Sequence, residues 1–348
     1  MHYTEPVGTG NAYRTAYQRD LEQLVWARQQ QFKEKSLADA ARFRDGDGMR
    51  EQLIRRLGWP LTDYAFSVPA VRRERVAEED GITIYRMQIE VLPGFRFYGI
   101  LFVREDGTPR PLVIAQHGGD GTPELCSSLE PLGSSNYNDM TRRLLAQDVN
   151  VFAPQLLLWN VNKYFPDSES PDLQRHQWDN RLKQCGGSIT ALEIYCLRRS
   201  LDWLSVQPFT APGEIGMAGL SYGGFYTLYT AAVEPRIRAA LSCAFFNDRG
   251  AYCWNDWTFF SGEPCFDPEV AMLCYPRLLL IAVGEHDPLF QIQTARAEAD
   301  RLRQLAQAAY GSTDWFVFRP FDGGHEFIRD DRLIPQLIRK IREKEETI

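Results

Sequence analysis

The chain has 348 residues, of which 44% are hydrophobic and 24% charged, and its formal net charge is −7. This length is enough for a large hydrophobic core, and the proportions are ordinary for a globular protein. An acidic chain without a basic tract among aromatic residues argues against nucleic acid or an anionic membrane surface as a partner. The composition leaves the oligomeric state open, a homo-oligomer included.

The sequence contains no apolar stretch of 18 residues, so no membrane span is expected. The first residues lack the charged start and apolar core of a signal peptide. The seven cysteines form no C-x-x-C pair, and an odd number without an export signal predicts reduced thiols in the cytoplasm. Cys253 and Cys265 lie in one aromatic loop, and the sequence leaves their pairing open.

The first part of the chain is predicted to be helical. Residues 17–34 and 49–57 repeat apolar side chains near helical spacing, and Trp59-Pro60 follows them. We therefore divide the chain into an N-terminal helical extension packed on the core, residues 1–75, and a main domain, residues 76–348.

The main domain begins with two predicted strands, residues 83–92 and 96–104, which alternate polar and apolar side chains. Pro93-Gly94 between them predicts a hairpin. Six further apolar runs alternate with helical segments, which predicts an α/β fold with a doubly wound, mostly parallel sheet. These runs are marked by Val113, Val151, Ile215, Ala239, Leu279 and Phe316. Ligands of such sheets bind outside the carboxyl ends of the strands.

The strand at residues 110–116 ends in the loop H-G-G-D-G, residues 117–121. Glycines at such a strand end let the backbone approach a ligand, and Gly118 or Gly119 could donate an N–H to an oxyanion. His117 is expected to fix the loop. The alternative is a plain turn, which the position after a core strand disfavours.

Residues 219–223 have the sequence G-L-S-Y-G, between an apolar run at 214–218 and a helical segment at 224–233. G-x-S-x-G between a strand and a helix is typical of the nucleophile elbow, which lifts the serine hydroxyl clear of the sheet at a helix N-terminus. Ser221 is therefore the candidate nucleophile, and the backbone N–H of Tyr222 is the second candidate oxyanion donor. The alternative is a chance match in a glycine-rich loop.

A serine at neutral pH needs a base, and the chain has five histidines. His325, in a glycine-rich loop after the apolar strand at residues 315–321, is the candidate base because it comes last in the chain. The strand at residues 277–283 runs into G-E-H-D-P, where Asp287 is the candidate acid and Glu285 the alternative.

Two segments that follow strand ends, residues 158–187 and 245–268, combine aromatic residues with Asn and Asp. Aromatic faces stack on sugar rings, but aromatics also bury long loops, and the sequence leaves both readings open. The candidate pocket residues are Trp159, Trp254, Trp257 and Phe259. No recognised metal-ligand spacing occurs, so neither a metal nor a cofactor is expected.

These elements, in this order, resemble the α/β-hydrolase superfamily. They are most similar to its dienelactone hydrolase-like and acetyl xylan esterase-like carboxylesterases. Residues 111–119, 191–204 and 275–288 carry the resemblance, which extends over residues 80–348. Dienelactone hydrolases proper have a cysteine where this chain has Ser221, a difference that argues for esterase chemistry.

The resemblance implies a serine carboxylesterase with the catalytic triad Ser221, His325 and Asp287. Its expected substrate is a small acyl ester, such as an acetylated carbohydrate, hydrolysed through an acyl-enzyme. A serine peptidase or another acyl hydrolase of the same fold is the alternative, although residues 1–75 are too few for the propeller of prolyl oligopeptidases. A binding module with an inactive site is the alternative of a different class, and the complete set of catalytic residue types argues against it.

Overall fold

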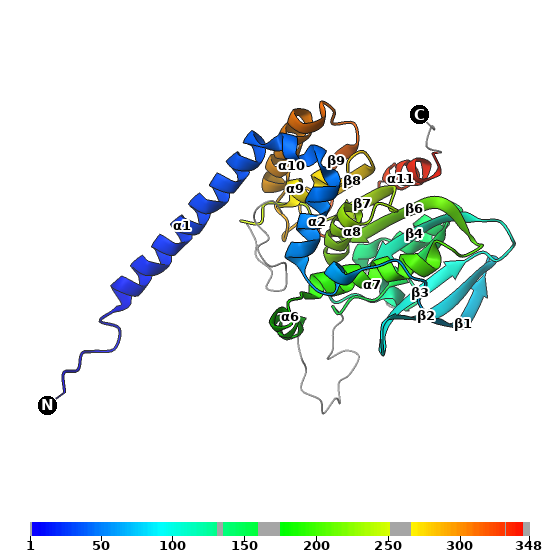
Figure 1. Ribbon diagram of the computed structural model, residues 1–348, viewed down its shortest axis with the longest axis horizontal. Coiled ribbons are helices and arrows are strands. Elements are labelled where there is room, and N and C mark those ends of the chain that lie inside the picture. The colour runs from blue at the N-terminus through cyan, green and yellow to red at the C-terminus, as the bar shows by residue number, and fades with distance from the viewer. Residues whose placement is uncertain (1, 131–134, 159–174, 251–265, 331, 344–348) are drawn as a thin grey trace.

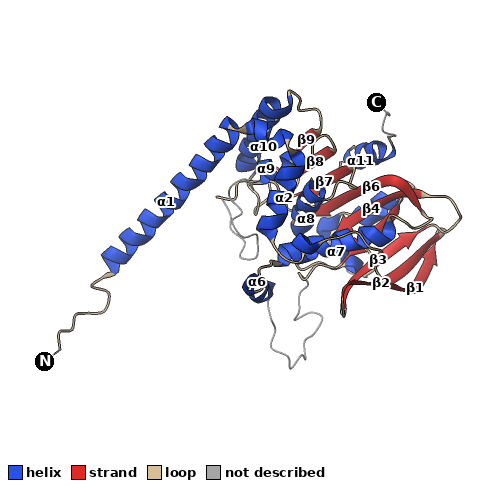
Figure 2. Cartoon of the chain, viewed as in Figure 1, coloured by secondary structure: helices blue, strands red, loops and turns tan. Residues whose placement is uncertain are grey.

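A nine-stranded sheet forms the centre of the molecule, and helices cover both of its faces (Figures 1 and 2). This computed structural model describes residues 2–130, 135–158, 175–250, 266–330 and 332–343. The strand order is β1-β2-β3-β5-β4-β6-β7-β8-β9. The strands are β1 (Val71–Glu79), β2 (Ile82–Leu92), β3 (Phe95–Val103), β4 (Arg110–Gln116), β5 (Asn150–Pro154), β6 (Thr210–Leu220), β7 (Ala239–Cys243), β8 (Leu278–Gly284) and β9 (Phe316–Phe321).

Two parts of the sheet differ in direction. β1, β2, β3 and β5 pair antiparallel in that order, whereas each neighbouring pair from β5 through β4 and β6 to β9 is parallel. Strands β5, β7 and β8 are buried along their whole length. Helices cover both faces of this parallel part, so its strands have continuous apolar runs instead of alternating side chains.

The helices form two layers around the sheet (Figure 2). Apolar side chains of α2, α7, α8, α9 and α10 pack on one face, and those of α3, α4 and α11 pack on the other. The α-helices are α1 (Asn11–Ala38), α2 (Gly46–Leu57), α3 (Pro123–Cys126), α4 (Met140–Leu145), α6 (Arg175–Gln184), α7 (Ile189–Leu204), α8 (Tyr222–Val233), α9 (Asp267–Met272), α10 (Ile292–Tyr310) and α11 (Leu333–Arg342). Short 3₁₀ helices are η1 (Ala40–Arg44), η2 (Leu61–Asp63) and η3 (Ser135–Tyr137).

The predicted fold class is confirmed: the sheet is doubly wound and mostly parallel, and the predicted hairpin is the antiparallel pair of β2 and β3. Strand β1 was not predicted. All but one of its residues are exposed, and charged side chains fill most of it, so it lacks the apolar alternation that marks a half-buried strand. It extends the sheet by pairing with β2 at the edge.

The N-terminal segment has two parts that differ in their packing. η1 and α2 join the core through buried residues that include Phe43, Met49, Leu53 and Leu57. Helix α1, in contrast, extends away from the body, and Ser36 is its one buried residue (Figure 1). The packing expected for the N-terminal extension is therefore seen from η1 onward, and most of α1 is outside it.

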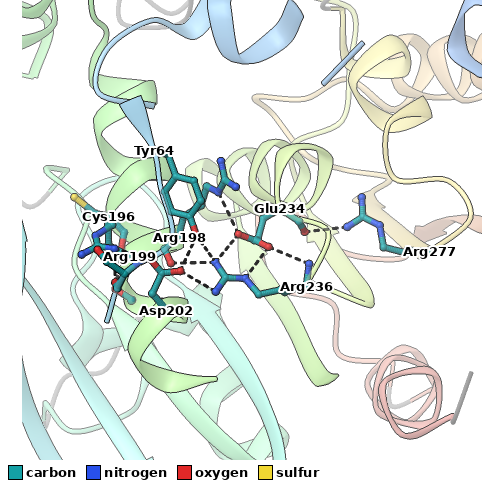
Figure 3. A network of polar contacts seen from close by, with 10 residues as sticks. Tyr64, Cys196, Arg198, Arg199, Asp202, Glu234, Arg236 and Arg277 are labelled. Atoms are coloured by element: carbon teal, nitrogen blue, oxygen red, sulfur yellow. Dashed lines mark hydrogen bonds and ion pairs between the residues drawn. The ribbon is translucent and has the colours of Figure 1, made fainter. Parts of the chain in front are cut away.

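A buried polar network joins the N-terminal segment to α7 and to the end of α8 (Figure 3). Arg236 Nη1 donates to Asp202 Oδ1 at 2.8 Å, and Arg236 Nη2 donates to Glu234 Oε2 at 2.7 Å. Tyr64 donates its hydroxyl hydrogen to Asp202 Oδ1 at 2.6 Å, and Arg198 Nε donates to Glu234 Oε2 at 3.1 Å. Glu234 is the C-cap of α8, so the network fixes the end of the helix whose start follows the candidate nucleophile.

Two arginines of this network keep the carboxylate of Glu234 charged. Burial alone would raise the pKa of Glu234, but the hydrogen bond and charge of Arg236, with the charge of Arg198, hold that pKa below its ordinary value. The side chain of Asp202 is completely buried, and Arg199 Nη1 donates to its Oδ2 at 2.6 Å. Removing either carboxylate would therefore leave guanidinium groups without their counter-charge.

We expect Asp202→Ala to lower the free energy of unfolding by about 3 kcal/mol, because Arg199 and Arg236 would lose a shared buried carboxylate. The control is Glu51→Ala, which removes an exposed ion pair with Arg55 on α2 and should change that free energy by less than about 0.5 kcal/mol. Urea denaturation of the three proteins measures both differences. Equal losses in the two variants would mean that the network does not stabilise the fold.

Candidate active site

Ser221 lies at the sharp turn between β6 and α8. Its backbone has φ of 59° and ψ of −120°, a left-handed conformation that costs a non-glycine residue about 1–3 kcal/mol. Hydrogen bonds on both sides hold it: Ser221 N–H donates to Cys243 O, and Ser221 O accepts from Phe225 N–H, each at 2.9 Å. This is the elbow geometry predicted from the sequence, with the serine at the first turn of a helix.

The glycines around Ser221 are required by close backbone contacts. A Cβ atom at Gly219 would collide with the carbonyl group of Gly223. A Cβ at Gly223 would collide with the backbone at the end of β4, and one at Gly118 would meet the Ser221 side chain. Strand β4, strand β6 and helix α8 therefore meet at Ser221 with no room for side chains between them.

His325 and Asp287 come together after the ends of β9 and β8. Their link to the elbow is Cys243, whose Sγ donates to Glu326 O at 3.4 Å and whose backbone carbonyl accepts the Ser221 N–H. The distance from His325 Nδ1 to Asp287 Oδ2 is 2.9 Å, and the Asp287 side chain is completely buried. The other oxygen, Oδ1, accepts the backbone N–H groups of Leu289 at 2.8 Å and Phe290 at 3.0 Å. The Phe290 ring stacks on the imidazole with centroids 5.7 Å apart, so the orientations of both side chains are fixed.

Glu285, the alternative acid, lies at the surface. Arg296 Nη2 donates to its Oε1 at 2.7 Å, and 42% of the Glu285 side chain is exposed. His286 is also exposed and lies 3.1 Å from Asp322. The structure therefore brings Asp287 and not Glu285 to His325.

The loop that carries His325 is tied to residues 136–138, a contact that the sequence analysis missed. Phe327 N–H donates to Asn136 O at 2.7 Å, and Asn138 Nδ2 donates to Phe327 O at 2.6 Å. Asn138 has φ of 48°, and the dipeptide Asn-Asp at 138–139, which tolerates this conformation, was the available signal. These bonds fix the backbone on the C-terminal side of His325.

His117 fixes the loop after β4, as predicted. It is completely buried; Nδ1 lies 2.8 Å from Gly118 O and Nε2 accepts from Leu156 N–H at 2.8 Å. Burial lowers the pKa of His117 to about 4, so the ring is neutral at pH 7, with the proton on Nδ1 donated to Gly118 O. The neutral ring bonds two backbone segments at once.

The two candidate glycine donors of the oxyanion hole differ in their surroundings. Gly118 N–H donates to the hydroxyl of Tyr137 at 2.8 Å, so it is engaged inside the protein. Within the described part of the chain, the Gly119 N–H has no acceptor. Gly119 also lies close to the Tyr222 ring. Of the two glycines, Gly119 is therefore the candidate donor, together with the backbone of Tyr222.

A cavity of about 740 Å³ adjoins the oxyanion loop. Thr122, next in the chain after that loop, lines it, and so does Gln155, whose Nε2 lies 3.1 Å from His117 Nε2. One wall is the β2–β3 hairpin, which continues past Pro154, the last residue of β5. The lining residues are Val76, Arg86, Phe95, Arg96, Phe97, Tyr98, Thr122, Glu124, Leu129, Glu130, Gln155, Leu157, Leu192, Glu193 and Cys196. The sequence does not reveal this cavity because its walls come from five segments that are far apart in the chain.

Glu193 of α7 binds the first insertion at two points, the residue just before it and Arg175 within it. Its carboxylate accepts from Arg175 in a bidentate pair, at 2.9 and 2.6 Å, and from Leu157 N–H at 2.7 Å. The guanidinium of Arg175 also lies 5.5 Å from the centre of the Tyr222 ring. Arg175 of the insertion is thereby connected to the residue that follows Ser221.

Asp267, near the end of the second insertion, binds two residues near the start of that insertion. Its Oδ2 accepts from Asn247 N–H and its Oδ1 from Arg249 Nε, both at 3.0 Å. Burial raises the pKa of Asp267 to about 6, against the opposing charge of Arg249. The predicted pocket residues of the two insertions, Trp159, Trp254, Trp257 and Phe259, and the cysteines 253 and 265, lie outside the described residues.

Three further observations concern the described residues alone. They contain no group of three or more His, Cys, Asp or Glu side chains placed to hold a metal ion. None of their helices has the length and hydropathy needed to cross a membrane. Their five cysteines, at positions 126, 185, 196, 243 and 274, are free thiols.

The sheet order, the elbow after β6 and the acid and histidine after β8 and β9 define an α/β-hydrolase fold. Solved structures with this fold include a candidate acetyl xylan esterase from Bacteroides fragilis, with TM-score 0.64 and 13% identity over 85% of this chain and 82% of that one. A glucuronoyl esterase from Solibacter usitatus has a TM-score of 0.61 and 10% sequence identity, with 84% of this chain and 91% of that one covered. Acetyl xylan esterase 1 from Thermoanaerobacterium sp. has a TM-score of 0.55 and 16% sequence identity, with 86% of this chain and 94% of that one covered.

Comparisons of sequence give a more limited result. The family profile described as X-Pro dipeptidyl-peptidase (S15 family) matches residues 194–266, which include the elbow. Among curated proteins, none matches the chain. The structural likeness, at 10–16% identity, establishes the fold that the sequence resemblance implied.

We expect Asp287→Asn to lower kcat/KM for an ester substrate by about 10⁴-fold, because the amide cannot hold His325 in the tautomer that accepts a proton on Nε2. Glu285→Gln, at the surface, should change it less than about threefold. Steady-state hydrolysis of a nitrophenyl ester measures both. The reverse ranking would assign the acid role to Glu285.

Proposed function

We propose that the protein is a serine carboxylesterase that works through an acyl-enzyme formed on Ser221. The observation that carries this proposal is the 2.9 Å contact of His325 Nδ1 with a completely buried Asp287, beside a serine in elbow geometry. A buried carboxylate that already accepts two backbone N–H groups is well suited to orient an imidazole and to stabilise its positive charge. A site that only binds ligands has no need of this combination.

In the proposed mechanism, Ser221 Oγ attacks the ester carbonyl carbon while His325 Nε2 takes the hydroxyl proton. The carbonyl oxygen becomes an oxyanion that accepts the backbone N–H groups of Gly119 and Tyr222. The tetrahedral intermediate expels the alcohol, which receives the proton from Nε2. Water then attacks the acyl-enzyme with His325 as base, and the acid product leaves with Ser221 Oγ reprotonated.

We propose further that the substrate is a small acyl ester of a carbohydrate, an acetyl ester for example. The cavity beside the oxyanion loop supports this class, because aromatic side chains, among them Phe95 and Tyr98, line it together with charged groups. Aromatic faces and hydrogen-bonding groups in one cavity suit a sugar ring. Two proteins of the same fold are described as an acetyl xylan esterase and a candidate acetyl xylan esterase.

A second candidate function is the removal of X-Pro dipeptides from peptides, which the profile match over residues 194–266 favours. Ser221 would attack a peptide carbonyl in the same way, with His325 as the base and the same backbone N–H groups as oxyanion donors. Such an enzyme needs a negative group or dipole to bind the peptide's α-amino group. Parallel assays with an acetyl ester and with a Gly-Pro anilide distinguish the two functions.

We expect Ser221→Ala to remain folded and to lose esterase activity by at least about 10³-fold, because no other group forms the acyl-enzyme. A fluorophosphonate probe should label the wild-type protein at Ser221 and leave the variant unlabelled. The structural control is the circular dichroism spectrum, which should be the same for both. Near-complete activity in Ser221→Ala would refute the assignment of the nucleophile.

The carbohydrate assignment has its own test at the tip of the β2–β3 hairpin. Phe95→Ala removes an aromatic face from the cavity, so KM for an acetylated xylo-oligosaccharide should rise about 5–10-fold. The kcat/KM for nitrophenyl acetate, which is too small to need this wall, should change less than about twofold. Phe66→Ala, at an exposed phenylalanine outside the cavity lining, is the matched control. An unchanged KM for the sugar ester would exclude the cavity as its binding site.

A further inference from the structure

Helix α1 is the feature of the fold that the proposed activity does not use. It is 28 residues long, which corresponds to roughly 42 Å, and it extends from the body into solvent (Figure 1). From Asn11 to Arg28 every residue except Ala16 is exposed. Most of the stability of a helix in a protein comes from tertiary packing, so the stability of this exposed helix depends on contacts with something else.

The contacts of α1 with its own body are at its C-terminal end. Lys33 Nζ donates to Asp248 Oδ2 and to Glu298 Oε1, each at 2.8 Å. Gln29 lies beside Gly250, at the start of the second insertion. The helix is therefore attached at one end, and its first five turns form an arm.

The exposed apolar side chains of the arm lie mainly on the side away from this attachment. Tyr13, Tyr17 and Leu24 are 81%, 75% and 66% exposed. At about 100° per residue they fall within about 40° of one another, with Leu21 next to them. Lys33 follows Leu24 by nine residues, which places it about 180° around the helix. The apolar stripe thus faces outward, where the molecule's own body does not cover it.

The amount of apolar surface is that of a protein interface. The stripe residues Tyr13, Tyr17 and Leu24 are all more than 60% exposed, and aromatic side chains such as the two tyrosines bury about 150–250 Å² each. A standard interface buries about 800 Å² per partner. In a two-fold dimer the contact made by the arm of one copy is repeated by the arm of the other copy. Two arms therefore provide enough apolar surface for a stable dimer.

Charge indicates what covers the arm. Helix α1 has five basic and three acidic residues, a net charge of +2, while the whole chain has −7, so the rest of the chain carries −9. A weakly basic arm complements the acidic body of another copy. The same acidic body would be repelled by an anionic lipid surface.

We propose that the protein is a two-fold symmetric dimer in which the α1 arm of each copy packs against its partner through Tyr13, Tyr17 and Leu24. The arm then has a tertiary partner along its whole length, and the apolar stripe is removed from water. This inference does not depend on the esterase activity, because the stripe lies outside the candidate active site.

The test uses the full chain and sedimentation or light scattering over a range of concentrations. The wild type should have twice the 40.0 kDa mass of one chain. Tyr17→Glu with Leu24→Glu should raise the dissociation constant of the dimer by about 100-fold, since two side chains at the centre of the interface become charged.

The matched control is Gln18→Glu with Gln23→Glu, which makes the same change in charge at two exposed polar positions of α1 away from the stripe. It should remain a dimer, and the circular dichroism of both variants should show the wild-type fold of the body. A monomeric wild type at every concentration would overturn the proposal, and so would equal weakening by the two variants. Binding of a monomeric wild type to vesicles of anionic lipid would assign the arm to a membrane instead.

Discussion

The backbone at Ser221 is the constraint around which the candidate site is built. Strand β6 turns into helix α8 within one residue, and the end of β4 lies against the same turn, so positions 118, 219 and 223 have no space for side chains. The serine adopts a left-handed conformation as a result, and two backbone hydrogen bonds hold it there. The strain is tolerated because the packed strands and helix leave no other path for the chain.

Hydrogen bonds between buried groups also fix the oxyanion loop and the acid of the candidate site. Neutral His117 bonds the oxyanion loop at Gly118 O to the segment after β5 at Leu156 N–H, and the Tyr137 hydroxyl accepts the Gly118 N–H. Asp287 accepts two backbone N–H groups with Oδ1 and contacts His325 with Oδ2. Preorganised groups of this kind stabilise developing charge without rearranging during the reaction.

The two insertions that follow strand ends are attached to the core by one device used twice. A buried helix carboxylate, Glu193 of α7 or Asp267 of α9, accepts hydrogen bonds from an arginine of the insertion and from a backbone N–H at or next to its start. The arginine compensates for the burial of the carboxylate, and the backbone bond fixes the direction in which the chain leaves. The network around Asp202 and Glu234 gives the opposite end of α8 a comparable attachment.

The sequence by itself determined the features that depend on residues close together in the chain. Apolar runs, helical spacing and the G-x-S-x-G turn specify the order of strands and helices, and with it the fold class and the positions of Ser221 and His325. Strand β1 could not be predicted because this exposed edge strand has no alternation of apolar and polar side chains. The tertiary structure alone decided the features that depend on side-chain direction and on distant segments. It placed Asp287 against His325 and Glu285 at the surface, and it paired the Gly118 N–H with Tyr137. It also formed the cavity from β1, β2, β3, α7 and the segments that follow β4 and β5. It also left the apolar stripe of α1 uncovered, since helical spacing indicates that a face exists but not what packs against it.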